Sequence, residues 1–226
     1  NQNELEMTSP NVPTRKKYGA DEESLTEWLT VHSRQVMWGA IALLVVGGGV
    51  WFYERSQSIK SQRAETAYFQ ARQSVEAGNL PLAISDLQKV VTRYEGTAAG
   101  SQAALTLAQA YYDQGKYKEG VEALKKAEDK VAKDFKASVH VLEAAGYEGL
   151  KDFANAAEQY KQAANSTRFP DDKASYQASA ARSYQAAGKV AEAKAIWTDL
   201  AKSQNTAIAG EARVRLGELS AKPQTV

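Results

Sequence analysis

Side chains that perform acid–base catalysis or bind metals are scarce in this sequence. It contains two histidines, His32 and His140, and no cysteine. An uncharged apolar stretch at residues 36–53 separates the histidines; if it crosses a membrane they stand on opposite sides and can form neither a metal cluster nor a catalytic pair. The absence of cysteine excludes thiol catalysis, disulfides and cysteine-based metal sites. Because no phosphate-binding loop, nucleophile elbow or zinc-protease helix is present either, we expect no enzyme, no cofactor, no bound metal and no small-molecule substrate.

Two groups of charged residues invite functional interpretations, but each has a simpler one. Asp171 and Asp172 follow Pro170, and acids in the first turn of a helix are stabilised by the helix dipole, so we interpret them as a helix start. Five lysines between residues 125 and 136 are interspersed with acids, which is typical of a solvated helix face. Over the whole chain 28 basic and 27 acidic residues nearly cancel, so we expect no nucleic-acid partner.

Residues 36–53, VMWGAIALLVVGGGVWFY, predict a membrane-spanning helix. Eighteen residues at about 1.5 Å each cover roughly 27 Å, close to the thickness of the hydrocarbon core of a bilayer. A buried helix of a soluble domain is the alternative, but such a helix usually keeps a polar face. A cleaved signal peptide fits less well, because mostly polar residues precede the stretch and no small-residue cleavage site follows it. We therefore expect a single-pass membrane protein in contact with lipid.

Aromatic residues and glycines predict where this span contacts the membrane surface and a neighbouring helix. Amphipathic rings settle at the headgroup levels of a bilayer. Three consecutive glycines remove side chains from part of the helix surface and would let a neighbouring span approach closely. No G-x-x-x-G spacing accompanies them, so glycines tolerated in a lipid-facing helix remain the alternative. The expected interface residues are Trp28, Trp38, Trp51 and Tyr53, and the expected helix-contact residues are Gly47, Gly48 and Gly49.

The segment before the span divides in two. Residues 1–20, with two prolines and a short basic run, predict a disordered tail. Residues 21–35 predict a short amphipathic helix, because Ser24 and Glu27 have capping-box spacing and apolar residues follow at helical spacing. This helix would lie on the membrane, dock on a partner or simply extend the span. Positive charges are equally numerous near both ends of the span, so charge does not decide its orientation.

Residues 64–226, which we expect to follow a linker at 54–63, predict an all-helical repeat domain. Small anchor residues recur with periods of 37, 36 and 37 residues, and a larger residue stands four positions after each. A break, glycine-containing in three of four units, separates two helical stretches in every unit. This pattern predicts about four divergent helix-turn-helix repeats stacked as a solenoid, closed by a capping helix at 205–222. The anchors are Ala83, Gly120, Ala156 and Ala193, and their larger partners are Leu87, Leu124, Tyr160 and Trp197.

The repeat positions resemble the tetratricopeptide pattern over about 160 residues. The first-helix tryptophan is missing in all four units, alanine replaces a usual glycine, and the period is longer than the usual 34 residues, so the repeats are divergent. An amphipathic helix, one span, the aromatic pair Trp51 and Tyr53, a linker and repeats from Ala64 follow in an order similar to the YfgM-like family, ancillary subunits of the bacterial Sec translocon. The longer polar tail departs from that family.

This resemblance implies a location, partners and a binding groove. It implies a protein of the bacterial inner membrane with a cytoplasmic N-terminus and a periplasmic repeat domain, whose partners are Sec translocon subunits and a PpiD-like chaperone. In tetratricopeptide-like stacking the first helices line a concave surface suited to recognising polypeptide. The residues expected to face that groove are Tyr68, Arg72, Gln109, Tyr112, Glu148, Arg182 and Gln185.

Two functions fit these features. The first is a membrane-anchored interaction module of a translocon and chaperone network that binds partner or client polypeptides. The second is a structural accessory subunit of another membrane complex, respiratory or envelope, that binds no client. Both require a span, a solenoid and a partner-facing helix, so the sequence alone leaves them open.

Overall fold

The structure, a computed structural model, describes residues 28–221. The predicted tail at 1–20 and the first part of the predicted amphipathic helix at 21–35 lie outside the described residues. The chain divides into two compact units, Asn1–Arg55 and Ser56–Val226, each with its own internal contacts.

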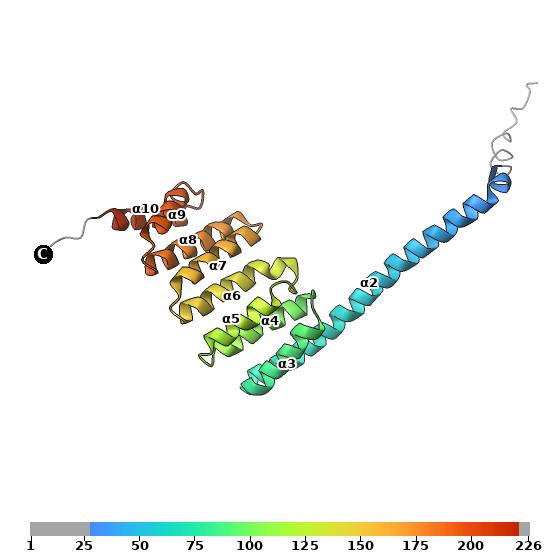
Figure 1. Cartoon of the computed structure of the whole chain (residues 1–226), viewed down its shortest axis with the longest axis horizontal. Coiled ribbons are helices and arrows are strands. Elements are labelled where there is room, and N and C mark those ends of the chain that lie inside the picture. Colours follow the sequence, from blue (N-terminus) through green and yellow to red (C-terminus); the bar gives the residue numbers. More distant parts are fainter. Residues whose placement is uncertain (1–27, 222–226) are drawn as a thin grey trace, which may run out of the picture. The chain divides into compact units, whose positions relative to one another are not determined.

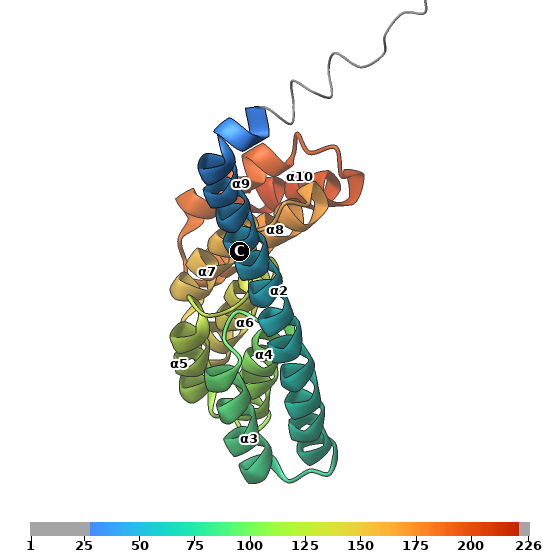
Figure 2. The same ribbon diagram turned by 90° about the vertical axis from the view of Figure 1, so that its right-hand side faces the viewer.

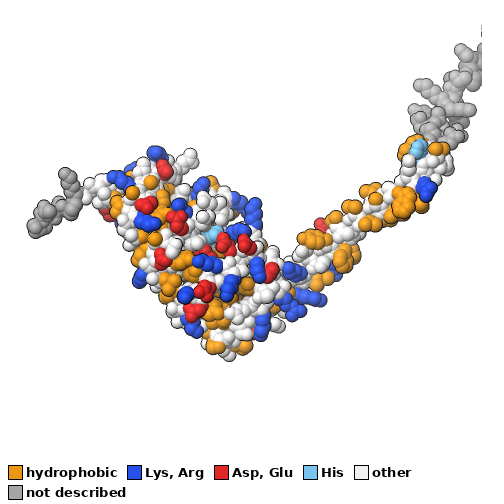
Figure 3. Space-filling view, viewed as in Figure 1, with side chains coloured by type: hydrophobic (Ala, Val, Ile, Leu, Met, Phe, Trp, Pro, Cys, Tyr) orange, Lys and Arg blue, Asp and Glu red, His pale blue; other side chains and the backbone are white. Residues whose placement is uncertain are grey.

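The first unit is dominated by the beginning of helix α2, which runs from Ser33 to Glu76 and so crosses the unit boundary. This helix contains an 18-residue window of mean hydropathy 1.8 in which no residue is buried. Its length and composition are sufficient to cross a membrane. Figure 3 shows hydrophobic side chains over much of the surface of this part of the helix. A core helix of a soluble domain would be mostly buried, so the exposed window disfavours that alternative.

Residues 54–63, which we expected to form a linker, are helical and belong to α2. No glycine or proline lies between Gly49 and Gly78, and the segment contains Gln, Lys and Arg, which have good helix propensity. Its polar composition therefore marks the end of the apolar surface and not the end of the helix.

The second unit is a stack of antiparallel helices, and its described residues contain no strand (Figure 1). The last part of α2 pairs with α3, and three further hairpins and a final helix follow (Figure 2). Consecutive helices from α3 to α10 pack against one another, and α4 also contacts α6, as α8 contacts α10. The all-helical solenoid predicted from the sequence is confirmed. The helices are α3 (Leu80–Arg93), α4 (Ala98–Tyr112), α5 (Tyr117–Ala127), η1 (Lys133–Phe135), α6 (Lys136–Gly149), α7 (Phe153–Ser166), α8 (Pro170–Ala186), α9 (Val190–Leu200) and α10 (Thr206–Ser220).

The turn inside each hairpin contains one residue in the left-handed conformation. Gly78, Gly115 and Gly188 have φ of 72°, 72° and 75°, and Lys151 takes the corresponding place in the third hairpin with φ 60°. Glycine adopts this conformation without steric cost, whereas a side chain with a Cβ is strained there. The third turn is therefore built with a less favourable residue than the other three.

The core contains the small anchors together with larger side chains of the same and neighbouring helices. Ala83, Ala156 and Ala193 are fully buried, as are Leu87, Leu124 and Trp197. At the second anchor, Gly120, an added Cβ would overlap the ring of Tyr112. At the C-terminal end Ile208, Leu216 and Leu219 of α10 pack against the cluster around Trp197 and close the apolar end of the stack.

Candidate protein-binding surface

The first helices of successive hairpins enclose a shallow hollow of about 380 Å³, which we call the α4–α6–α8 hollow. Leu105, Val141 and Leu142 give it an apolar floor, and hydroxyl and amide groups surround them. No charged side chain lines it among the described residues, so it suits an uncharged, partly apolar segment. Its lining is Leu105, Thr106, Gln109, Ser138, Val141, Leu142 and Tyr176.

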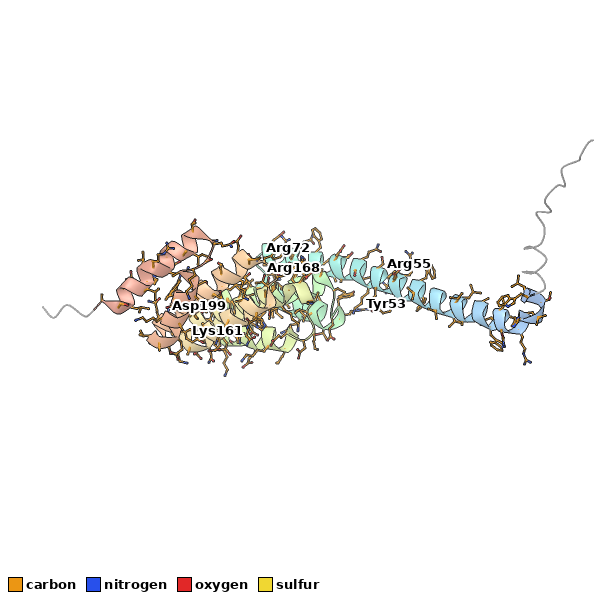
Figure 4. All side chains as sticks on the ribbon, turned by 90° about the horizontal axis from the view of Figure 1, so that it is seen from above. Tyr53, Arg55, Arg72, Lys161, Arg168 and Asp199 are labelled. Atoms are coloured by element: carbon orange, nitrogen blue, oxygen red, sulfur yellow. The ribbon has the colours of Figure 1, made fainter. Side chains whose placement is uncertain are left out.

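Of the seven predicted groove residues, only Gln109 lines this hollow. Its amide donates a hydrogen bond to Asp113 Oδ1 at 2.8 Å. Tyr68 stands beside the hollow, because its hydroxyl lies 2.9 Å from the hydroxyl of Thr106, one of the lining residues. Arg72, labelled in Figure 4, is exposed on α2 and forms an ion pair with Glu76 at 2.7 Å.

Tyr112 was expected to face the groove, and this expectation was wrong. Its side chain is only 8% exposed, and its hydroxyl donates a hydrogen bond to the carbonyl of Leu142 at 2.9 Å. Burial, followed by the nearby charge of Glu143, raises the pKa of Tyr112 well above its usual value of 10.0. The ring lies against Gly120 and Gly146, where an added Cβ would overlap it, so it is a core residue.

The remaining predicted residues form bonds within the last two hairpins and the final helix. Glu148 accepts hydrogen bonds from the hydroxyls of Ser183 at 3.0 Å and Tyr160 at 3.4 Å. Arg182 binds both carboxylate oxygens of Glu211 in α10, at 2.8 and 2.9 Å. Gln185 accepts a hydrogen bond from the indole of the buried Trp197 at 2.7 Å. A partner would have to displace these bonds, so these side chains serve to hold neighbouring helices of the stack together.

Some lining residues that were not predicted could have been found from the repeat period of the sequence. Leu105 and Val141 occupy the repeat position of Tyr68, one and two periods later along the chain. Applying the period to Tyr68 would have found both. Ser138 and Tyr176 carry no comparable signal, because small polar and aromatic residues are common throughout the domain.

Residues predicted for the membrane helix are exposed in the structure. Trp28, Trp38, Trp51 and Tyr53 are all exposed. Tyr53 and Arg55 project from α2 where the apolar surface gives way to polar residues (Figure 4). A Cβ added at any of the three predicted contact glycines would meet no atom within 4 Å, so their surface is free for a neighbouring helix or for lipid. These glycines are Gly47, Gly48 and Gly49.

A buried polar cluster lies between α5, α6 and α7. Glu143 is 1% exposed, its Oε1 has no hydrogen-bond partner among the described residues, and its Oε2 lies 3.8 Å from His140 Nδ1. His140 Nδ1 donates to Gln159 Oε1 at 3.0 Å, and its Nε2 lies 3.7 Å from Glu128 Oε1. The nearby carboxylate of Glu143 is the main cause that raises the pKa of His140 above its usual value. In residues 28–221 no group of three or more His, Asp or Glu side chains is placed to hold a metal ion.

Stacked helical hairpins with small residues at their contacts define a tetratricopeptide-like repeat protein. A family model described as a tetratricopeptide repeat-like domain matches residues 26–143. The chain belongs to this tetratricopeptide repeat-like family. Such repeats typically act as non-catalytic scaffolds for protein–protein interaction.

Solved structures share this fold at low sequence identity. One contains nearly identical TPR-like repeats of a protein described as a putative kinesin light chain from Podosopora anserina; it is 19% identical, covers 70% of this chain and 85% of its own, and gives a TM-score of 0.51. A thermophilic TPR protein of Thermus thermophilus is 21% identical over 82% of this chain and 95% of its own, with a TM-score of 0.44. No curated protein matches the chain significantly. The first likeness supports the fold alone.

Proposed function

We propose that this chain is a membrane-anchored interaction protein that binds a polypeptide segment in the α4–α6–α8 hollow. The observation that carries the proposal is the lining of the hollow, where Leu105, Val141 and Leu142 are surrounded by uncharged hydrogen-bonding groups. Apolar side chains of a partner would be desolvated on this floor, while Gln109 and Tyr176 provide polar groups for its backbone. The enclosed region is small, so it fits a short segment and not a folded domain.

Anchoring is supported by the exposed apolar part of α2. In this proposal residues 36–53 cross the membrane, residues 54–63 lead away from it as helix, and residues 64–226 form the binding domain. The exposed tryptophans Trp38 and Trp51 would lie at the two headgroup levels. Resemblance to the YfgM-like family supports a bacterial inner membrane, with residues 1–35 in the cytoplasm and the repeats in the periplasm.

The partners proposed on the same basis are Sec translocon subunits and a PpiD-like periplasmic chaperone, with emerging or unfolded chains as clients. The alternative is a structural subunit permanently built into another membrane complex. The shape and chemistry of the hollow favour the first, because an open, uncharged surface suits exchangeable segments of differing sequence.

Anchoring and orientation can be tested together, because the chain has no native cysteine. Single cysteines would be introduced by Thr8→Cys before the span and by Ser203→Cys after α9, and treated with a membrane-impermeant maleimide in cells whose outer membrane is permeabilised. We expect labelling of the Ser203→Cys variant in intact inner membranes and of the Thr8→Cys variant only after lysis. Equal labelling of both before lysis, or release of the protein by alkaline carbonate, would contradict the anchor.

Binding in the hollow is tested by Val141→Glu, which places a charge on the apolar floor. We expect at least about tenfold weaker recovery of crosslinked partners, because the carboxylate must be desolvated without a counter-charge. Val214→Glu, on the exposed side of α10, is the matched control and should leave recovery unchanged. If both variants behave like the native chain, partners do not bind in the hollow.

A further inference from the structure

A second depression lies on another face of the same unit, between α3 and α5 and above α4. We call it the α3–α5 groove, and its volume is about 450 Å³. Val91, Leu107 and Ala123 contribute its apolar surface, and Gln88, Glu122 and Lys126 contribute polar walls. None of these residues lines the α4–α6–α8 hollow, so the groove is a separate surface.

The two walls of this groove run in the same direction. Helices α3 and α5 each pack against α4, which lies between them in the chain. Their C-terminal ends are tied by the ion pair between Lys130 and Glu95 at 2.7 Å and by the hydrogen bond from Gly96 N to the Lys130 carbonyl at 2.7 Å. The groove between parallel walls therefore has a defined polarity, with both helix C-termini at one end.

Charges follow this polarity. Glu119 and Glu122 come first in α5, Lys126 follows near its end and Lys130 lies just beyond it, and all four line the groove. Of these four residues, Lys130 is paired with Glu95, whereas no ion pair involves Glu119, Glu122 or Lys126 in the described part of the chain. Along α3, Asp86 precedes Lys89 and Arg93 in the same order, but none of the three lines the groove, and Asp86 and Lys89 pair with each other at 2.9 Å. The groove thus has an acidic end with free carboxylates and a basic end with a free ammonium group.

We propose that the α3–α5 groove binds an amphipathic α-helix of a partner protein, antiparallel to α3 and α5. Acidic side chains in the first turns of that helix would meet Lys126 and its neighbours, and basic side chains in its last turns would meet Glu119 and Glu122. This order of charges is also the one that the dipole of an isolated helix favours. The dipoles of the bound helix and of the two walls are then opposed, as in neighbouring antiparallel helices.

The alternatives fit this surface less well. An extended peptide would gain no backbone pairing, because helical walls offer no free strand edge. A surface of anionic lipid would be repelled by the two glutamates that face the groove. An apolar floor with oppositely charged ends is instead the pattern of a helix-in-groove site, where side chains at helical spacing fill the depression.

The absence of native cysteine allows a direct test of both occupancy and direction. The full chain carrying Thr92→Cys, at the basic end, would be reconstituted in nanodiscs of neutral phosphatidylcholine. The probe is a synthetic amphipathic peptide of about 18 residues, long enough for a stable amphipathic helix, with one leucine stripe, glutamates in its first turns and lysines in its last. It would be made with a single cysteine at either its N-terminus or its C-terminus, and disulfide trapping would be followed over time.

We expect the N-terminal cysteine peptide to be trapped at residue 92 about tenfold faster than the C-terminal one. A peptide of the same composition with the charge order reversed should be trapped more slowly. In the triple variant Glu119→Lys, Glu122→Lys and Lys126→Glu, which changes exposed side chains only, the preference between the two charge orders should invert. Val214→Cys on α10 is the control position and should show no preference.

Equal trapping of all peptides, or a preference that the triple variant does not change, would overturn the proposal, because it would indicate binding to lipid or non-specific collapse. Retained helicity and retained partner binding at the α4–α6–α8 hollow would show that the triple variant is folded. Failure of this proposal leaves the proposed function intact, because Val141 lies outside the groove.

Discussion

Single residues in this domain show where its repeats deviate from an ideal stack. Lys151 adopts a left-handed conformation that glycine occupies in the other three hairpin turns. His140 and Glu143 are buried close together in a domain whose other buried side chains are mostly apolar. Both deviations have consequences for stability that can be measured without knowing a partner.

His140 should make the stability of the domain depend on pH. The pKa of His140 is raised in the folded protein above its usual 6.5, with the nearby carboxylate of Glu143 as the first cause and Gln159 and Glu128 as further ones. A raised pKa means that protonated His140 stabilises the fold fully below about pH 6.5 and that this contribution is lost as the pH rises through the folded pKa. Lys125 and Tyr112 also face Glu143, but their raised pKa values keep them protonated throughout this range.

We therefore expect the melting temperature of the full chain in detergent to fall between pH 6 and pH 8. A loss of 1 kcal/mol corresponds to roughly 2–4 °C for a domain of this size. His140→Gln keeps a hydrogen-bonding group but cannot titrate, so its melting temperature should be lower at pH 6 and nearly flat over the same range. A native chain whose melting temperature rises over this range would contradict the assigned role.

Replacing Lys151 with glycine should stabilise the domain. The substitution removes the steric strain of a side chain at φ 60°, a gain of roughly 1 kcal/mol that exceeds the entropic cost of glycine. Gly115→Ala, at the corresponding turn of the second hairpin, is the matched opposite and should destabilise by a similar amount. Thermal unfolding of both variants provides the measurement, and stabilisation by both would show that left-handed strain is not the cause.

At the scale of the helices, the close contact of α4, α5 and α6 depends on Tyr112. Its ring occupies the space beside Gly120 and Gly146, and its hydroxyl binds the carbonyl of Leu142 in α6. One aromatic side chain thus contacts all three helices at their point of closest approach. Positions 120 and 146 require glycine, because the ring leaves no room there for a Cβ.

Gly120→Ala should therefore destabilise the domain by roughly 1–3 kcal/mol, despite the better helix propensity of alanine. Gly210→Ala is the matched control, because a Cβ at this helical position meets no atom within 4 Å, and it should be neutral or slightly stabilising. Combining Gly120→Ala with Tyr112→Leu should recover part of the loss if the ring is the obstacle. A Gly120→Ala variant as stable as the Gly210→Ala variant would mean that the contact is looser than the structure shows.

The helices themselves were predictable from the sequence to different degrees. The repeat period and the turn glycines indicated four hairpins and a closing helix, because both follow from local chain properties. The helical conformation of residues 54–63 was missed because their polar composition was given more weight than the absence of glycine and proline.

Side-chain directions were harder to predict. A small shift in helix phase turns a residue from the groove into the core, as at Tyr112, and the sequence signal for this was the pair of glycines opposite the ring. Arg182 and Gln185 were placed on the correct helix, but their bonds to Glu211 and Trp197 depend on how α8 meets α9 and α10. Such contacts between distant segments depend on packing that the repeat period does not specify.

At the scale of the whole molecule, an apolar helix and a repeat domain are joined in one chain. The exposed apolar surface of α2 needs a bilayer or another apolar environment, since so large a patch is rare on a soluble monomer. The repeat domain presents two separate surfaces, the α4–α6–α8 hollow and the α3–α5 groove, with different chemistry. In the proposed account the first receives an uncharged segment and the second a charged amphipathic helix, so one anchored scaffold could hold two partners.

The most direct test of the central claim is site-specific photo-crosslinking in native membranes. A photoreactive phenylalanine analogue would replace Val141 in the α4–α6–α8 hollow or, as a control, the exposed Val214 in α10. We predict crosslinks from position 141 to several polypeptides, including membrane-complex subunits and transient chains, and few from position 214. A single stoichiometric neighbour at position 141 would favour the structural-subunit alternative, and equal crosslinking at both positions would contradict binding in the hollow.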